Sequence, residues 1–243
     1  MINNLFIKNI RIKWNEIGED SYLRGIQSLA STEEVCFNKP VTFFVGENGS
    51  GKSTLLEAIA VAYGFNPEGG TKNYCFSTFD SHSELCDAIT ISKGYVKPRW
   101  GYFLRAESFY NVATKEDEYS RLPGGVPEFF HERSHGESFM QVINSNFRES
   151  GIYILDEPEA ALSPQRQLTL LYEINRCVKG GAQFIIVTHS PILLGLPDAD
   201  IISFDDGELH RIDYEEAESY KITEMFINRR KQVLENLFEE KGR

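Results

Sequence analysis

Residues 46–54, GENGSGKST, fit the pattern G-x-x-x-x-G-K-[ST], which is typical of phosphate binding. Gly46 and Gly51 allow the tight backbone turn that points successive N–H groups and a helix N-terminus at a phosphate. Lys52 adds a positive charge, and the Ser53 hydroxyl is suited to ligating Mg²⁺. The alternative is a glycine turn without a ligand. The apolar run before the loop and the helical pattern after it favour the phosphate site.

Two further apolar runs end in residues that can act on a phosphate. The run IYILDEP ends in Asp156, which can hold Mg²⁺ through water, and in Glu157, which can orient or deprotonate an attacking water. The run IIVTHS places His189 at the matching edge, within reach of a γ-phosphate. Each of these residues taken alone is more often an ordinary strand end or a structural histidine. Together with the glycine loop they indicate a nucleotide site.

The stretch HERSHGES, residues 131–138, has two interpretations. Its first five residues match H-E-x-x-H, the zinc-protease helix in which two histidines bind the metal. Residues 134–138, SHGES, instead suit a short loop that caps a helix and receives a phosphate. A zinc site needs a third ligand, which nothing nearby nominates, and Gly136 would weaken the helix it requires. These eight residues alone do not decide between the two interpretations.

The elements that must position these residues alternate along the chain. Buried apolar strands are expected at residues 41–46, 151–158 and 182–190, with a further strand candidate at 101–109. Helices are expected at 51–64, 137–147 and 163–181, the last with Ser163 as its N-cap. Residues 5–12 alternate as a half-buried strand, residues 65–100 read as loops and short elements, and residues 199–213 form a hairpin that turns at Asp206-Gly207. Apolar strands alternating with helices predict an α/β fold with a largely parallel sheet that helices cover on both faces.

From residue 5 to residue 207 the sequence resembles the ABC class of ATPases. Residues 46–54 are similar to that family's Walker A motif, residues 152–157 to Walker B with the catalytic Glu157, residues 161–163 to the D-loop, and His189 to the switch histidine. Residues 134–138 fall where the signature loop belongs, so the resemblance implies that the H-E-x-x-H match is a coincidence. Ser134 and Gly136 keep the loop's phosphate contact although the sequence is unusual. The family's Q-loop glutamine is missing, and Glu107 is the candidate substitute.

This resemblance implies a P-loop NTPase fold with an antiparallel N-terminal β part and a small helical insertion that carries the signature loop. We expect one domain over residues 1–243, with the insertion at about 65–150 and a helical tail at about 214–243. It also implies hydrolysis of ATP with Mg²⁺, with Lys52, Glu157 and His189 as catalytic residues and Ser53, Asp156 and Glu107 at the metal. The residues expected to bind nucleotide are Gly46, Glu47, Asn48, Gly49, Ser50, Gly51, Lys52, Ser53, Thr54, Ser134 and Gly136.

The same resemblance implies a head-to-tail homodimer that forms on ATP and holds two nucleotides between the Walker A of one chain and Ser134 of the other. Only 82 residues separate Lys52 from Ser134, too few for the long coiled coil of SMC-type ATPases. The leading interpretation is a small stand-alone ATPase that acts as a switch for a protein effector in DNA repair or defence. The alternatives are the nucleotide-binding subunit of an ABC transporter and an ATP sensor that does not hydrolyse.

The composition limits which classes of partner and which cellular compartment we expect. The net charge of −11 disfavours indiscriminate binding to nucleic acid and leaves residues 229–231, RRK, as the one obvious basic run in the sequence. The four cysteines are scattered without a C-x-x-C pair, as in reduced proteins. No apolar run reaches the length of a membrane span, and the first residues lack a signal peptide's apolar core. We therefore expect a cytoplasmic protein without a membrane span.

Overall fold

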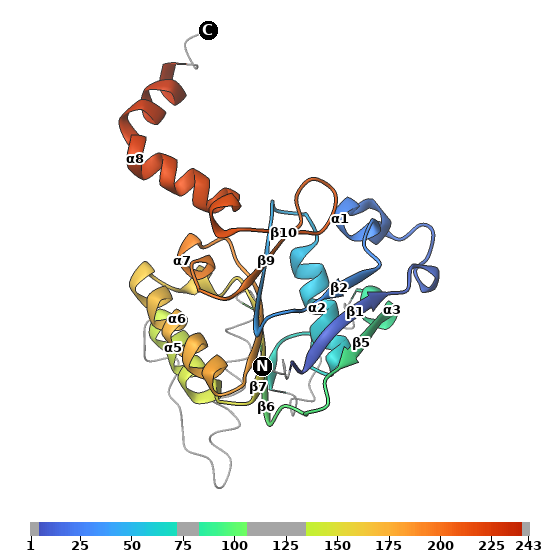
Figure 1. The fold of residues 1–243 in the computed structure, drawn as a ribbon. Helices are drawn as coiled ribbons and strands as arrows, with labels where there is room; N and C mark the ends of the chain where they lie inside the picture. Colours follow the sequence, from blue (N-terminus) through green and yellow to red (C-terminus); the bar gives the residue numbers. More distant parts are fainter. Residues whose placement is uncertain (1–4, 72–82, 106–134, 240–243) are drawn as a thin grey trace.

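The computed structural model describes residues 5–71, 83–105 and 135–239, and it is a mixed α/β fold (Figure 1). Its main sheet has seven strands, of which the five central ones run parallel and the two at the edges antiparallel. This confirms the predicted largely parallel sheet. The strands, in spatial order, are β10 (His210–Ile212), β9 (Asp200–Ser203), β3 (Val41–Val45), β8 (Gln183–Val187), β7 (Gly151–Asp156), β6 (Trp100–Arg105) and β4 (Gly70–Thr71).

The central strands are apolar because helices cover both faces of the sheet. Every residue of β3, β8 and β9 is buried, and β7 is buried up to Asp156 at its end. Strands covered on both faces read as continuous apolar runs rather than as alternating ones. The carboxyl ends of the strands reach the same edge, since Phe44 pairs with Val187, and Val187 with Asp156. Loops that leave these strands therefore meet at one edge of the sheet.

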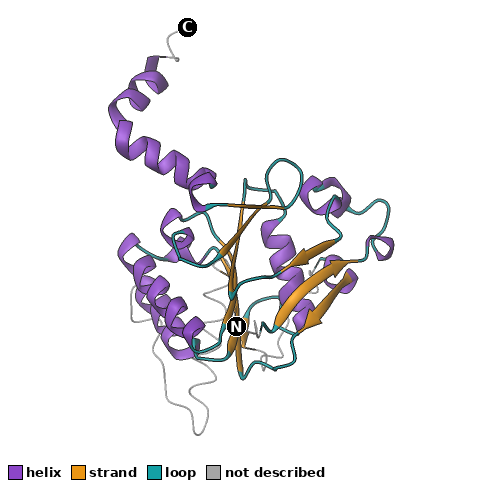
Figure 2. Cartoon of the chain, in the orientation of Figure 1, coloured by secondary structure: helices purple, strands orange, loops and turns teal. Residues whose placement is uncertain are grey.

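Each face of the sheet has its own hydrophobic core. On one face, helix α2 (Lys52–Tyr63) packs against Ile154 and Ile185; on the other, α5 (His135–Asn146), α6 (Pro164–Lys179) and α7 (Pro191–Leu194) pack against Tyr153 and Phe184. The helices lie on opposite sides of the sheet in Figure 2. Helix α6 begins and ends where the sequence predicts, with Ser163 as its N-cap, Pro164 at its first position and Gly180 as its C-cap.

A second, antiparallel sheet lies over α2, as the expected N-terminal β part. Its strands are β2 (Glu34–Cys36), β1 (Ile7–Ile12) and β5 (Ile89–Lys93), in that spatial order. The sequence predicts β1 but not β2 or β5. Gln183, at the start of β8, joins this sheet to the main one because its Oε1 accepts hydrogen bonds from the N–H groups of Phe6 (2.8 Å) and Ile7 (2.9 Å), and its Nε2 donates to the Ile7 carbonyl (2.9 Å).

The remaining elements are short, apart from the last helix. Helix α8 (Glu218–Glu239) projects from the body of the protein and kinks at Arg229 (Figure 1). In the described part of the chain, no helix combines the length and the apolar character that crossing a membrane requires. The short helices and 3-10 turns are η1 (Trp14–Glu16), η2 (Tyr22–Gly25), α1 (Gln27–Ala30), α3 (Leu85–Ala88), η4 (Pro158–Ala161) and η5 (Tyr214–Glu216).

Candidate functional site

The glycine loop joins the end of β3 to the start of α2, as the sequence predicts. Gly46, Gly49 and Gly51 have φ values of 139°, 84° and 93°, a backbone conformation that residues with a Cβ rarely adopt. At Gly51 a Cβ would also come within 2.8 Å of Ile26 Cγ2 and 3.0 Å of Leu29. Glycine is therefore required here both by the turn and by the close approach of the segment that contains α1.

Two polar side chains from distant parts of the chain hold the loop in place. The Glu47 N–H donates to Asp205 Oδ1 (2.9 Å), directly beyond β9, and the Ser28 hydroxyl donates to the Ser50 carbonyl (2.5 Å). The sequence does not single out Asp205 or Ser28. The signal that could have found Asp205 is its place after an apolar strand, in the run IISFDD.

Lys52 is buried at the N-terminus of α2 and turns its ammonium group into the loop. Its Nζ donates to the carbonyls of Gly46 (2.7 Å) and Glu47 (2.6 Å). Burial lowers the pKa of Lys52, and four carboxylates oppose that shift: Glu157, Asp205, Asp156 and Glu47, in decreasing order. A partly desolvated ammonium group interacts more strongly with an incoming anion than one in open water.

Ser53 and Asp156 meet at the edge of the sheet. The Ser53 hydroxyl donates to Asp156 Oδ1 at 2.9 Å, across the gap between α2 and the end of β7. A hydroxyl and a carboxylate oxygen are the hard donors that Mg²⁺ prefers, and Mg²⁺ usually takes its remaining ligands from phosphates and water. This donor pair fits the ion that the sequence analysis expects.

Glu157 and His189 lie beside this pair. Their side chains remain 43% and 42% exposed, and His189 Nε2 is 3.8 Å from Glu157 Oε1. Glu157 adopts a left-handed backbone conformation (φ 47°, ψ 53°) while its N–H donates to the Val187 carbonyl (3.0 Å). Such a conformation costs about 1–3 kcal/mol in a non-glycine residue and is found preferentially at functional sites. Both side chains are thus accessible at this edge of the sheet.

Glu159 contacts the backbone of His189. The sequence does not predict this residue as part of the site. The His189 N–H donates to Glu159 Oε1 at 2.6 Å. Burial raises the pKa of Glu159, and the hydrogen bond from His189 opposes the rise. The other oxygen, Oε2, is buried, and a side-chain hydrogen bond with Thr188 also opposes the rise of the pKa. A second carboxyl group with a raised pKa therefore lies beside the Glu157–His189 pair.

The remaining predicted site residues lie in the loop, at two helix starts or outside the described ranges. Asn48 lies in the glycine loop, Thr54 in the first turn of α2, and Gly136 in the first turn of α5. Glu107 and Ser134 lie outside the described residues, as do four of the five residues of the H-E-x-x-H match. Within residues 5–71, 83–105 and 135–239, no group of three His, Cys, Asp or Glu side chains is arranged to hold a metal.

A charged pair occupies the end of β6, next to this edge. Arg105 pairs with Asp156 in the sheet register, and its Nη1 is 2.8 Å from Glu57 Oε2 on α2. Both side chains of this ion pair are largely buried. The pair fixes the end of β6 to α2, and Glu107 comes two residues later in the sequence.

Comparisons with known sequences match most of this region. The sequence model of a family described as "AAA domain" matches residues 22–157, more than half of the chain. A second AAA domain model, whose description adds the AbiEii toxin and the Type IV TA system, matches residues 142–195.

Two curated proteins named Ribose import ATP-binding protein RbsA are similar to the chain. The one from Roseobacter denitrificans is 23% identical over 188 residues, which cover 68% of this chain and 36% of the relative. The one from Clostridium tetani is 25% identical over 193 residues, which cover 71% and 38%. The matched region thus spans well under half the length of these relatives.

Solved structures with a similar arrangement include the SMC head domain from Thermotoga maritima and MJ1267, an ATP-binding cassette of an ABC transporter. The SMC head is 16% identical with a TM-score of 0.45, and the alignment covers 86% of this chain and 99% of that one. MJ1267 is 18% identical with a TM-score of 0.46, and the alignment covers 91% and 99%.

Proposed function

The chain belongs to the AAA domain family of P-loop ATPases, and from this premise we propose that it binds ATP with Mg²⁺ and hydrolyses it to ADP and phosphate. One observation carries the proposal. The glycine loop, the Ser53–Asp156 pair and the Glu157–His189 pair lie at one edge of the sheet, although they come from three separate strands.

The loop and Lys52 would bind the phosphates. The first N–H groups of a helix have no partner inside the helix, so those at the start of α2 are available to an anion. Lys52 now donates to two loop carbonyls, and it would redirect this donor to a phosphate oxygen when the nucleotide enters. These preorganised donors would also stabilise the charge that develops during transfer of the phosphoryl group.

Ser53 and Asp156 would hold Mg²⁺. The ion, when bound, supplies positive charge that offsets the negative charge of the phosphate oxygens. The 2.9 Å contact between the two side chains shows that their oxygens already meet at one point beside the loop. Glu107, two residues beyond β6, remains a proposed further ligand.

Glu157 would position the attacking water and accept its proton. The water oxygen then forms a bond to the γ-phosphorus as the bond from phosphorus to the β–γ bridging oxygen of ADP breaks. His189, 3.8 Å from Glu157, would donate a hydrogen bond to the γ-phosphate. The backbone link from His189 to Glu159 would keep this imidazole at the edge of the sheet.

The half-exposed Glu157 and His189 also leave a surface that a second protomer can cover. We propose that ATP joins two copies, with Ser134 of each chain contacting the nucleotide of the other, and that this dimer is a switch for a protein effector in DNA repair or defence.

The names of the curated relatives favour a second candidate, the ATP-binding subunit of an importer. Copurification with a membrane protein would support that candidate.

The proposal is tested by ATP turnover and ATP affinity of the parent, Glu157→Gln and the exposed control Glu19→Gln. We expect Glu157→Gln to lose turnover by roughly 100-fold or more, the contribution of a general base, while it binds ATP with the affinity of the parent. Lys52→Ala should lose both. Turnover by Glu157→Gln at the parent rate would disprove the role of Glu157. Turnover absent from the parent as well would indicate a sensor.

Dimer formation is tested separately by the mass in solution of Glu157→Gln in saturating ATP and Mg²⁺. A mass of two chains, returning to one chain in ADP, is the expected result. A variant that binds ATP and stays monomeric would contradict the dimer and leave the assignment of the ATP site intact.

A further inference from the structure

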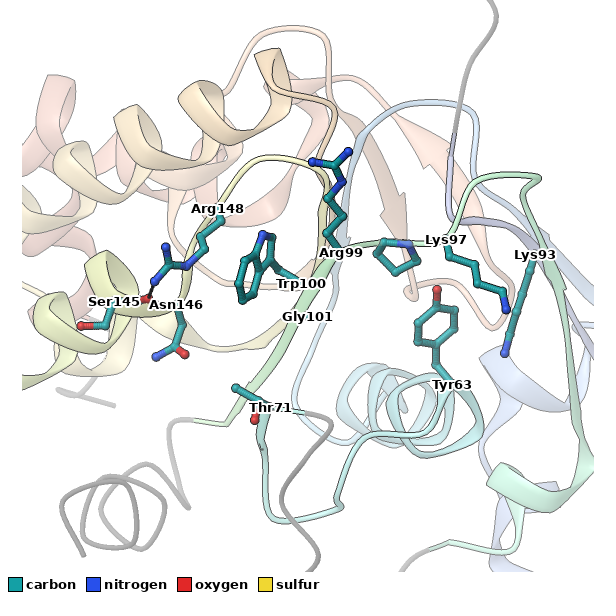
Figure 3. Close-up of a pocket in the computed structure, with 11 residues that line it drawn as sticks. Tyr63, Thr71, Lys93, Lys97, Arg99, Trp100, Gly101, Ser145, Asn146 and Arg148 are labelled. Atoms are coloured by element: carbon teal, nitrogen blue, oxygen red, sulfur yellow. Dashed lines mark hydrogen bonds between the residues drawn. The ribbon is translucent and has the colours of Figure 1, made fainter. Parts of the chain in front are cut away.

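A hollow lies at the amino ends of β6 and β7, at the edge of the main sheet opposite the glycine loop. Its volume is about 480 Å³, and Lys93, Lys97, Arg99, Trp100 and Arg148 line it together with smaller residues (Figure 3). Helix α2 joins the two sites, because Lys52 begins the helix at the glycine loop and Tyr63 ends it at this hollow. Twelve helical residues span roughly 18 Å. The hollow is therefore separate from the ATP site.

The charge of the hollow is opposite to that of the whole chain. Four of its lining residues are Lys or Arg and none is Asp or Glu, although acidic residues outnumber basic ones by 36 to 25 in the sequence. All four cations are exposed, and none forms an ion pair with a carboxylate in the described ranges. A local cluster of such cations in an acidic protein marks a site for an anion.

Aromatic rings alternate with these cations. Trp100 is 50% exposed, and the Arg148 guanidinium lies 4.9 Å from the centroid of its ring. Lys93 Nζ lies 4.8 Å from the centroid of Tyr63. In Figure 3 Arg148 and Trp100 form one side of the hollow, and Lys97, Lys93 and Tyr63 form the other. The hollow thus offers both a flat apolar ring and positive charge on either side of it.

The cationic surface continues past Trp100. A neighbouring hollow shares Arg99, Trp100 and Arg148 with the first and adds Arg176, with Glu149 as its one acidic lining residue. Arg176 is paired with Glu173 at 2.8 Å. Because the two hollows share Arg99, Trp100 and Arg148, we treat them as one cationic track, and its extent suits a chain of phosphates better than a single phosphate group.

We propose that this track, defined by Lys93, Lys97, Arg99, Trp100 and Arg148, binds single-stranded nucleic acid. An unpaired base would stack on Trp100 while the flanking phosphates contact the Arg and Lys side chains, which is the combination that single-strand binding uses. In a duplex the faces of the bases are covered by their neighbours in the stack, and an acidic peptide carries no bases. Single-stranded nucleic acid offers both exposed base faces and phosphates. The inference goes beyond the proposed function, because binding here requires neither ATP nor a dimer.

The first test is the fluorescence anisotropy of a labelled oligothymidylate titrated with protein in the absence of ATP. The variant is Arg99→Glu/Arg148→Glu, and the control is Arg230→Glu/Lys231→Glu, which changes the charge equally at the basic run of α8. Losing two phosphate contacts should weaken binding on the order of tenfold or more and lower the slope of log affinity against log salt by roughly 1.4. The control should bind like the parent.

The second test uses Trp100 as the reporter. The chain has two tryptophans, so Trp14→Phe leaves Trp100 as the only one. Oligothymidylate should quench its fluorescence, Trp100→Ala should weaken binding on the order of tenfold, and Trp100→Phe should restore most of the affinity. Thermal unfolding of each variant establishes that it is folded.

Several outcomes would overturn the proposal. They are an unquenched Trp100, a control that loses as much affinity as Arg99→Glu/Arg148→Glu, and equal competition by duplex DNA or inorganic polyphosphate. The last result would reveal a purely electrostatic surface. A failure here leaves ATP turnover untouched, so it cannot be confused with a failure of the proposed function.

Discussion

At the scale of single residues, a largely buried carboxyl group lies next to the exposed side chains of the site. Glu157 and His189 are half exposed, whereas Glu159 lies beside them and accepts a hydrogen bond from the His189 backbone. Burial raises the pKa of Glu159, so the folded protein binds a proton there more readily than the unfolded chain does. The ionised form therefore lowers the stability of the folded protein.

Glu159→Gln should stabilise the protein at neutral pH and lose that advantage in acid. The free energy of unfolding of the parent falls as pH rises from 4.5 through the raised pKa, because the unfolded chain binds fewer protons over that range. A gain of about 1 kcal/mol would raise the Tm by roughly 2–4 °C. Thermal unfolding at neutral pH and below pH 4.5 checks this. A gain that is the same at both pH values, or a loss at neutral pH, would contradict it.

At the scale of elements, the glycine loop depends on the segment directly after β9. Asp205 accepts the Glu47 N–H, and its carboxylate also contributes to the field around Lys52. The loop is thus fixed at its first turn by a residue that comes 158 positions later in the sequence. Its conformation is a property of the assembled sheet as well as of the glycines.

Asp205→Ala should weaken ATP binding, while Asp205→Asn should retain most of it. The alanine removes the acceptor of the Glu47 N–H, and the asparagine keeps an oxygen at the same place. A hydrogen bond to a charged group contributes about 1.5–3 kcal/mol, so part of that free energy, on the order of tenfold in affinity, should be lost in the alanine variant. Titration calorimetry with ATP measures it. Equal affinity for all three proteins would show that the loop needs no such anchor.

The elements with a strong apolar pattern could be predicted from the sequence, and those stabilised mainly by pairing could not. β3, β7 and β8 are buried runs, and α6 has a cap at each end. β5 has one buried residue of five and is held by its ladder to β1, so its sequence carries little signal.

The same distinction applies to the site. Lys52, Ser53, Asp156, Glu157 and His189 could be grouped because each lies at or just beyond the end of a recognisable strand or its loop. Asp205 also follows an apolar strand, but its contact with Glu47, 158 positions away, carries no local signal, and neither does the contact of Ser28 with Ser50, 22 positions away. Glu159 carries no distinguishing signal either, because only the fold buries its carboxyl group.

At the scale of the whole molecule, one amide side chain connects the two sheets. Gln183 satisfies three backbone groups of Phe6 and Ile7 and is almost fully buried. The amide oxygen accepts two of these bonds and the amide nitrogen donates the third, so the side chain matches its partners in shape and in polarity. No apolar residue of similar size can replace its hydrogen bonds.

Gln183→Leu should therefore lower the stability of the whole fold by about 3 kcal/mol or more, since each buried group left without a partner costs about 1–3 kcal/mol. Gln167→Leu is the matched control, because Gln167 is only partly buried and its Oε1 accepts a bond from Ser190 within one face of the sheet. Urea unfolding compares the two. If both variants lose the same free energy of unfolding, the hydrogen bonds of Gln183 between the two sheets stabilise the fold no more than those of Gln167 do.

The strand order also determines when β3 can pair with its neighbours during synthesis of the chain. β3 ends at Val45, but its neighbours in the sheet begin at Gln183 and Asp200. At translation rates of about 5–20 residues per second, synthesis reaches β8 or β9 on the order of ten seconds after β3 has been made. During that interval a five-residue apolar strand has both edges unpaired, which is the kind of segment that associates with other chains. Nascent chains of this protein should accordingly depend on holdase chaperones until β8 and β9 have been made.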